Sequence, residues 1–131
     1  MGKSSSVTSS FSGITQGYTE LANPCGGMFS GPARRDLVFQ VNVQAAGLLV
    51  VTVDPSLSSG SASADVGYGV TTGSSCAGAT PVGVCVNAAG VMGVESGPAI
   101  PVNAGTYFIW VSVASVSTGP LTRVEVTARL Q

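Results

Sequence analysis

The stretch LVFQVNV, Leu37 to Val43, alternates apolar and polar residues with a period of two. Leu37, Phe39, Val41 and Val43 have one parity, and Val38, Gln40 and Asn42 have the other. Because successive side chains of a strand point to opposite faces, this pattern predicts a β-strand with one face on a core. After the short turn AAG, the run LLVVTVD, Leu48 to Asp54, offers Leu49, Val51 and Val53 to the core. The two runs predict a β-hairpin.

Similar short runs, separated by Gly, Ser and Pro, continue along the chain. Strands are expected within SVTSSFSGIT, DVGYGVTTG, VGVCVN, TYFIWVSVAS and RVEVTARL, and an edge strand near Pro98 and Pro101. TYFIWVSVAS begins apolar on both parities, which indicates a central strand. No run predicts a helix. Seven to nine strands at this spacing predict an all-β fold, an antiparallel β-sandwich of jelly-roll-like type.

Length and composition limit the class of protein. The 131 residues suit a single domain, which we expect over residues 7–131, with residues 1–6 a tag or a flexible N-terminus. Only 8% of the residues are charged, against about 25% in ordinary soluble proteins, and the five basic residues are scattered. Nucleic-acid binding is therefore not expected. The apolar runs are far shorter than the roughly 20 residues of a membrane-spanning helix, so no membrane span is expected.

Three cysteines, Cys25, Cys76 and Cys85, allow three single disulfide pairings. Cys76 and Cys85 flank the turn-like segment AGATPVGV, and we favour that pair. Such a bridge implies an oxidising compartment, so we expect a secreted, extracellular protein. Cys25 is then a small buried residue or a free thiol rather than half of an intermolecular bridge.

The residue inventory argues against catalysis. The chain has no histidine, which excludes Ser-His-Asp and Cys-His arrangements and most catalytic zinc sites. Three scattered cysteines do not make a four-cysteine zinc site, and nothing in the sequence pairs two carboxylates as glycoside hydrolysis requires. We therefore predict a protein that is not an enzyme and needs no cofactor.

Aromatic side chains are the candidate ligand-binding residues. Trp110 and Phe108 share the second face of the central strand, and Tyr18 and Phe29 lie in loops. Exposed, rigid aromatic faces bind sugar rings and peptides. The alternative, which we favour, is a strand covered on both faces, either by the long loop Leu21 to Arg35 or by another subunit.

The order of these runs resembles one family. FSGIT, DLVFQV, GLLVVTVD, ADVGYGV, NAGTYFIWVSV and GPLTRVEVTA follow one another as in the bacterial pre-peptidase C-terminal domains and their collagen-binding relatives. The turn AGTY leading into a strand is the strongest signature. The resemblance implies a jelly-roll-like β-sandwich carried as a non-catalytic accessory beside a secreted hydrolase, which in collagenase relatives grips an insoluble substrate.

Some members of that family bind calcium, so calcium is a cofactor that the resemblance implies. Calcium takes six to eight oxygen ligands, several of them clustered carboxylates. The six acidic residues of this chain are spread along the sequence. From the residues themselves we expect Asp36 and Asp65 to cap strand ends or to accept hydrogen bonds.

Two hypotheses about function follow. The first is a secreted, non-catalytic module that binds a polymer surface, either a polysaccharide or a fibrous protein, or a parent secreted enzyme. The second is a self-assembling structural subunit of an extracellular filament or coat, because low charge, apolar loops and a spare Cys25 suit burial between copies.

Overall fold

The computed structural model describes residues 4–10, 36–55, 64–74, 80–87, 93–116 and 123–131. These residues form nine β-strands: β1 (Ser4–Ser10), β2 (Asp36–Val43), β3 (Gly47–Asp54), β4 (Ala64–Thr72), β5 (Thr80–Val86), β6 (Glu95–Ser96), β7 (Ile100–Val102), β8 (Gly105–Val116) and β9 (Arg123–Leu130). In this part of the chain, no helix is long and apolar enough to cross a membrane.

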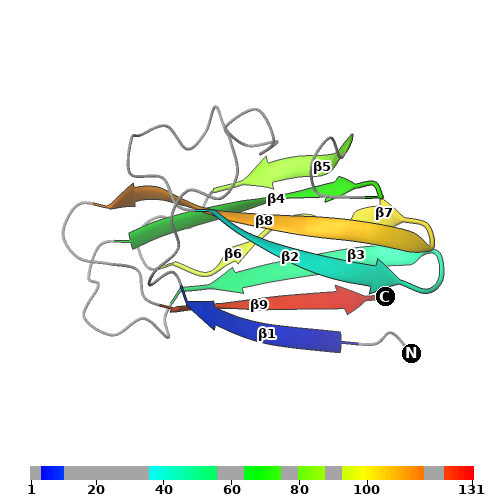
Figure 1. Ribbon diagram of the computed structural model, residues 1–131, viewed down its shortest axis with the longest axis horizontal. Helices are drawn as coiled ribbons and strands as arrows, with labels where there is room; N and C mark the ends of the chain where they lie inside the picture. Colours follow the sequence, from blue (N-terminus) through cyan, green and yellow to red (C-terminus); the bar gives the residue numbers. More distant parts are fainter. Residues whose placement is uncertain (1–3, 11–35, 56–63, 75–79, 88–92, 117–122) are drawn as a thin grey trace.

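The strands make two antiparallel sheets (Figure 1). Sheet A has the order β1-β9-β3, and both β6 and β7 pair with the remaining side of β3. Sheet B has the order β2-β8-β4-β5. The predicted antiparallel β-sandwich is confirmed. The strand TYFIWVSVAS, within β8, is central as predicted, because it lies between β2 and β4.

The pairing pattern is that of a jelly roll. β6 and β7 act as one strand interrupted between Ser96 and Ile100, since they follow each other along β3. With that strand counted once, the first strand pairs with the last, the second with the next to last, and so on inward: β1 with β9, β2 with β8, β3 with β6 and β7, and β4 with β5. This nesting is a long hairpin folded over into two sheets, which confirms the jelly-roll-like prediction.

The predicted hairpin between LVFQVNV and LLVVTVD is wrong. β2 pairs with β8 in sheet B, whereas β3 pairs with β9 in sheet A. Residues 44–46 therefore cross from one sheet to the other instead of forming a hairpin turn. Both strands still turn an apolar face inward, because the two sheets face the same core.

The core lies between the two sheets and is built from alternate residues of their strands. Its most buried members in sheet A are Leu49, Val51, Val53, Val124 and Val126, and in sheet B they are Val66, Tyr68, Val70, Ile109 and Val111. Tyr68 also joins the sheets by hydrogen bonds. Its Oη donates to the backbone oxygen of Val51 (3.2 Å) and accepts from the backbone N–H of Gly97 (2.9 Å).

Gly97 must be a glycine to make this contact. A Cβ atom added at Gly97 would lie 2.5 Å from Cγ2 of Val86 and 2.7 Å from Oη of Tyr68. The close approach occurs where the strand pairing with β3 is interrupted, between β6 and β7. The break in the edge strand thus admits the tyrosine hydroxyl that links the sheets.

The segment NAGTY forms a tyrosine corner. Oη of Tyr107 accepts a hydrogen bond from the backbone N–H of Asn103 (3.0 Å) and donates one to its backbone oxygen (3.1 Å). In β-sandwiches, a tyrosine whose hydroxyl bonds to the backbone a few residues upstream is a known feature of the connections between strands. In this chain, the AGTY signature has a structural role.

The first strand begins earlier than expected. β1 starts at Ser4, and its partners in β9 run from Arg129 opposite Ser4 to Arg123 opposite Ser10. Residues 4–6, expected to belong to a tag or a flexible N-terminus, therefore lie in a strand. The sequence shows no alternation of apolar and polar residues here, because Ser4, Ser5 and Ser6 are identical.

Candidate binding groove along strand β2

Trp110 and Phe108 are buried. Their exposed fractions are 0% and 5%, and they alternate along β8 with the core residues Tyr107, Ile109 and Val111, so they face away from sheet A. Nε1 of Trp110 donates a hydrogen bond to Oγ1 of Thr71 (2.9 Å). These side chains do not form the exposed aromatic surface considered as a ligand site; their burial agrees with the alternative of a strand covered on both faces.

Glycines in the neighbouring strand help to bury the indole. Gly69 of β4 is the cross-strand partner of Trp110, and Gly67 precedes it on the same face. Both glycines are buried. Because they carry no side chain, they leave space beside the large ring of Trp110. The glycine alternation of GYG in β4 thus serves packing against β8.

The other sequence-predicted site residues lie largely outside the described residues. This holds for Tyr18 and Phe29, and for Cys25 and Cys76. Cys85, on β5, is disulfide-bonded. The Cys76–Cys85 pairing stays a prediction.

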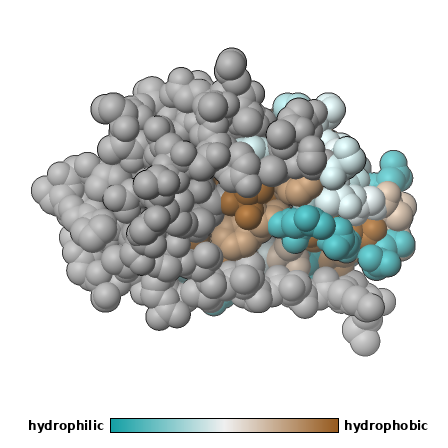
Figure 2. Space-filling view, viewed as in Figure 1, coloured by the Kyte–Doolittle hydropathy of each residue, from teal (hydrophilic) through white to brown (hydrophobic). Residues whose placement is uncertain are grey.

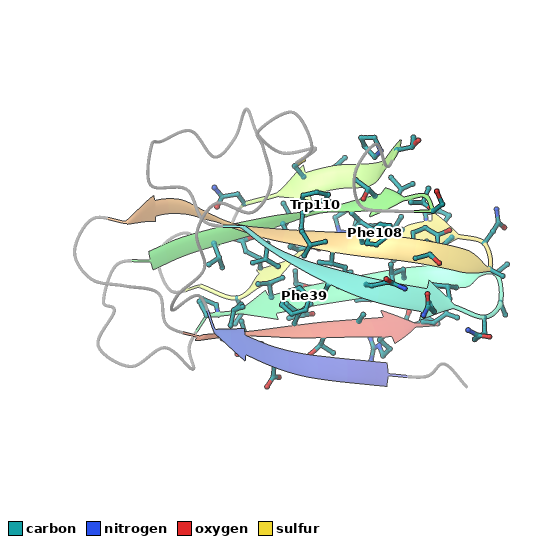
Figure 3. All side chains as sticks on the ribbon, in the orientation of Figure 1. Phe39, Phe108 and Trp110 are labelled. Atoms are coloured by element: carbon teal, nitrogen blue, oxygen red, sulfur yellow. The ribbon has the colours of Figure 1, made fainter. Side chains whose placement is uncertain are left out.

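An open groove runs beside β2, between the two sheets. It has a volume of about 470 Å³ and is lined by Val38, Phe39, Gln40, Val41, Asn42, Ile109, Val126 and Ala128. Apolar side chains gather in the middle of this face, and hydrophilic ones lie to their right in the view (Figure 2). Phe39 projects from β2 toward β9 and is the aromatic ring of the lining (Figure 3). The sequence placed Phe39 on the core side but did not reveal the groove.

The floor of the groove is apolar and its rim is polar. Phe39 and Val41 are partly buried and pack against the core cluster, whereas Gln40 and Asn42 are exposed. Oδ1 of Asn42 accepts hydrogen bonds from Nε2 of Gln40 (3.3 Å) and from Oγ1 of Thr106 (3.2 Å). The lining residues carry no formal charge. The groove can therefore hold an uncharged, partly apolar chain.

β2 is also an edge strand. It pairs with β8 on one side, and no strand of the described residues pairs with its other side. In an antiparallel pair, alternate residues point their N–H and C=O groups away from the partner. The groove is therefore bordered by a row of backbone donors and acceptors.

The described residues do not supply a calcium site. No three Cys, Asp or Glu side chains gather among them in a way that could hold a metal ion. Asp54 and Glu125 are cross-strand partners in sheet A, but two carboxylates fall short of the six to eight oxygens that calcium takes. These residues do not fit the ion that the family resemblance implies.

Of the comparisons with known proteins, the one with solved structures bears on the fold. No protein-family model and no curated protein matches the chain. Among solved structures, a protein from Sulfurospirillum deleyianum superposes with a TM-score of 0.52 at 5% identity, over 98% of both chains. A carbohydrate-binding module, CBM36, in complex with calcium and xylotriose gives a TM-score of 0.35 at 16% identity, over 94% of this chain and 97% of that one. The first of these likenesses concerns the fold alone, and the second is too loose to inform function.

Proposed function

We propose that the chain is a secreted, non-catalytic binding module that holds an extended polymer chain in the groove along β2. The observation that carries this proposal is the groove itself, with its apolar floor of Phe39 and Val41, its polar rim of Gln40 and Asn42, and a strand edge that no described strand pairs. Pockets that are mainly apolar with a few convergent polar groups are the usual binding sites of proteins.

A fibrous protein is the favoured polymer, ahead of a polysaccharide. Sugar rings stack on exposed aromatic faces. Among the described residues, Tyr68, Tyr107, Phe108 and Trp110 are buried, and the one other aromatic ring, Phe39, is partly buried. An extended peptide, in contrast, can add to a free strand edge by main-chain hydrogen bonds and place alternate side chains in an adjacent groove. Strand β2 offers both elements, a groove and an edge that no strand of the described residues pairs. A parent secreted enzyme would use the same features if it presented an extended segment.

The secreted location is part of the proposal and has separate support. Cys85 is disulfide-bonded, and disulfides persist in oxidising compartments. The low content of charged residues and the resemblance to pre-peptidase C-terminal domains point the same way.

A retention assay tests the proposed function. The wild-type protein is incubated with insoluble collagen, with cellulose and with chitin, and the bound fraction is measured after washing. We expect retention on the fibrous protein and its loss in Phe39→Ala and in Gln40→Ala, with each variant's fold verified by thermal unfolding. Leu48→Ala, a change at a 43% exposed residue of β3, is the matched control and should bind like the wild type.

Either of two outcomes would overturn the proposal. In the first, the wild-type protein is retained on none of the three polymers. In the second, it is retained and both groove variants bind as well as Leu48→Ala. Retention on cellulose or chitin that depends on Phe39 would keep the groove and replace the fibrous protein with a polysaccharide.

The alternative function, a self-assembling structural subunit, is favoured by a separate observation. β2 is an uninterrupted edge strand whose run from Leu37 to Val43 contains no charged residue. Such edges pair readily with further strands. The partner that this edge would take is derived below.

A further inference from the structure

The four sheet edges differ in how they discourage pairing with another chain. Natural proteins protect exposed edges with prolines, bulges, charges and interruptions. β5, at one edge of sheet B, contains Pro81 and an irregular register around Gly83, whose φ is +69°. The edge made by β6 and β7 is interrupted between Ser96 and Ile100 and contains Pro101. Both edges are poor templates for a further strand.

The other two edges are continuous, and they differ in composition. β1 reads SSSVTSS, with Val7 its one apolar residue. β2 reads DLVFQVNV, with no proline and no glycine, and its one charged residue, Asp36, stands at the start. Uncharged segments of high β-propensity without proline are the segments that pair most readily. Of the edges in the described part of the fold, β2 is the one built to accept a strand.

We propose that β2 of one copy pairs antiparallel with β2 of a second copy, about a twofold axis that passes between the two copies of Gln40. This inference deepens the self-assembly alternative, because it names the partner and the strand, and it does not depend on polymer binding. Symmetric pairing of one patch with itself is the commonest way in which proteins form dimers.

The sequence of β2 is self-complementary in this register. Gln40 meets its own copy, and the other pairs are Phe39 with Val41, Val38 with Asn42, and Leu37 with Val43. Paired residues of neighbouring strands lie on the same face of a sheet, so the core-facing side chains of the two copies are brought together. Sheet B then continues from one copy into the other, with apolar neighbours beside Phe39 and Val41, the floor of the groove.

The charges of the strand also fit a second copy. The one charged residue, Asp36, falls opposite Gln44, a neutral and exposed residue just after β2. No like charges face each other along the strand, whereas like charges directly opposite would disfavour pairing. The interface therefore requires no counter-charge from a different protein.

A charge-swap experiment tests both the partner and the register. The mass of the protein is measured by size-exclusion chromatography with light scattering, over a wide range of concentration and in the presence of reductant. We expect the wild type to shift from monomer to dimer as the concentration rises. Gln40→Lys and Gln40→Glu should each remain monomeric, because each places two like charges opposite one another at the axis. Gln40 is exposed, so neither change affects the core.

Mixing the two variants is the decisive step. An equimolar mixture of Gln40→Lys and Gln40→Glu should form dimers again, because a lysine then faces a glutamate. Val84→Lys, a charge on the opposite edge of sheet B at a 59% exposed residue, is the control and should dimerise like the wild type. A wild-type protein that stays monomeric, or a Gln40→Lys variant with the same mass profile as the wild type, would overturn the inference.

The result is independent of the polymer assay, because mass is measured without polymer. Dimers with no polymer retention would leave self-assembly as the function of β2. Polymer retention by a monomeric wild type would refute the dimer and leave the binding module in place. If copies of the protein assembled into particles of increasing mass, and the Gln40→Lys variant did so as well, self-assembly would use another surface. That result would refute the proposed pairing.

Discussion

The outer faces of the two sheets differ sharply in what covers them. On sheet A, the residues that face away from the core include the exposed Leu48, Ser96 and Arg129 and the half-buried Thr52 and Thr127. On sheet B, the corresponding residues of β8 and β4 are Trp110, Phe108 and Thr71, all of them buried. Sheet A is an ordinary half-buried sheet. Sheet B is buried over its centre on both faces.

This difference explains why two similar strands have different sequences. β9 reads RVEVTARL, in which polar residues alternate with buried ones, as expected for one solvent-facing side. β8 contains the unbroken apolar run YFIWV, from Tyr107 to Val111, all of it buried. An aromatic residue in such a run contributes to stability before it contributes to recognition. Trp110 is therefore not an exposed aromatic ring for ligand binding. The aromatic ring that lines the groove is Phe39.

The largest expected effect comes from Trp110→Ala. Removal of a fully buried tryptophan costs about 3 to 5 kcal/mol in free energy of unfolding, through lost burial and the cavity left behind. The measurement is chemical denaturation followed by far-UV circular dichroism, because Trp110 is the one tryptophan of the chain. On sheet A, Leu48→Ala should cost no more than about 0.5 kcal/mol, as is usual for exposed sites.

Burial of Trp110 can also be checked without a substitution. Its fluorescence in the native protein should be shifted to the blue and resist quenching by acrylamide, and both properties should be lost on unfolding. If Trp110→Ala unfolded at the wild-type denaturant concentration and the native indole were readily quenched, the outer face of sheet B would be open. The contrast between the two faces would then disappear.

A smaller effect is expected at Tyr68, which belongs to sheet B but bonds to sheet A. Tyr68→Phe removes the hydroxyl that pairs with the backbone of Val51 and Gly97, at a cost of about 1 to 3 kcal/mol. Tyr107→Phe is the matched control, since that hydroxyl bonds only to the nearby backbone of Asn103 among the described residues. A loss at Tyr107 as large as that at Tyr68 would contradict a special role for the link between the sheets.

Tyr68 also predicts a pH dependence. Burial raises the pKa of Tyr68 above its ordinary value of 10.0, the hydrogen bond from Gly97 lowers it in part, and the charge of Glu95 raises it further. The folded protein therefore holds the phenol proton more tightly than the unfolded chain does. The resulting stability is present below about pH 10 and is lost as the pH rises through the raised pKa. Unfolding measured across alkaline pH should show this loss in the wild type and in Tyr107→Phe, and less of it in Tyr68→Phe.

Much of the fold could be predicted from the sequence, because alternation reveals which face of a strand is buried. Leu49, Val51 and Val53 are buried as predicted, and the alternating run RVEVTARL buries Val124, Val126 and Ala128 in β9. Alternation does not reveal which strand is the partner. β2 pairs with β8, which lies far along the chain, and not with the neighbouring β3. The predicted hairpin failed for that reason.

The candidate site was predicted less well for the same physical reason. Within the described residues, β2 has a groove and an edge without a paired strand because β8 occupies one side of β2 and β9 lies across the core, and neither fact is local in sequence. The sequence did reveal that YFIWV has two apolar faces, and the alternative of a covered strand followed from it. It also contained the run LVFQVNV, which is mainly apolar and has no proline, glycine or charged residue, and this combination marks the edge as different from the others.

The finest test of the contrast uses one substitution on both faces. Thr71→Val on sheet B removes the hydroxyl that accepts the hydrogen bond from Nε1 of Trp110, so it should cost about 1 kcal/mol. Thr52→Val on sheet A replaces a hydroxyl with a methyl group at a half-buried strand position and should change stability by less than about 0.5 kcal/mol, in either direction. Both values come from denaturant unfolding, with Trp110→Phe added to close a double-mutant cycle on Thr71. Equal effects of valine at the two positions, or no coupling between Thr71 and Trp110, would mean that the buried hydroxyl contributes nothing specific and that sheet B is held by packing of the apolar rings alone.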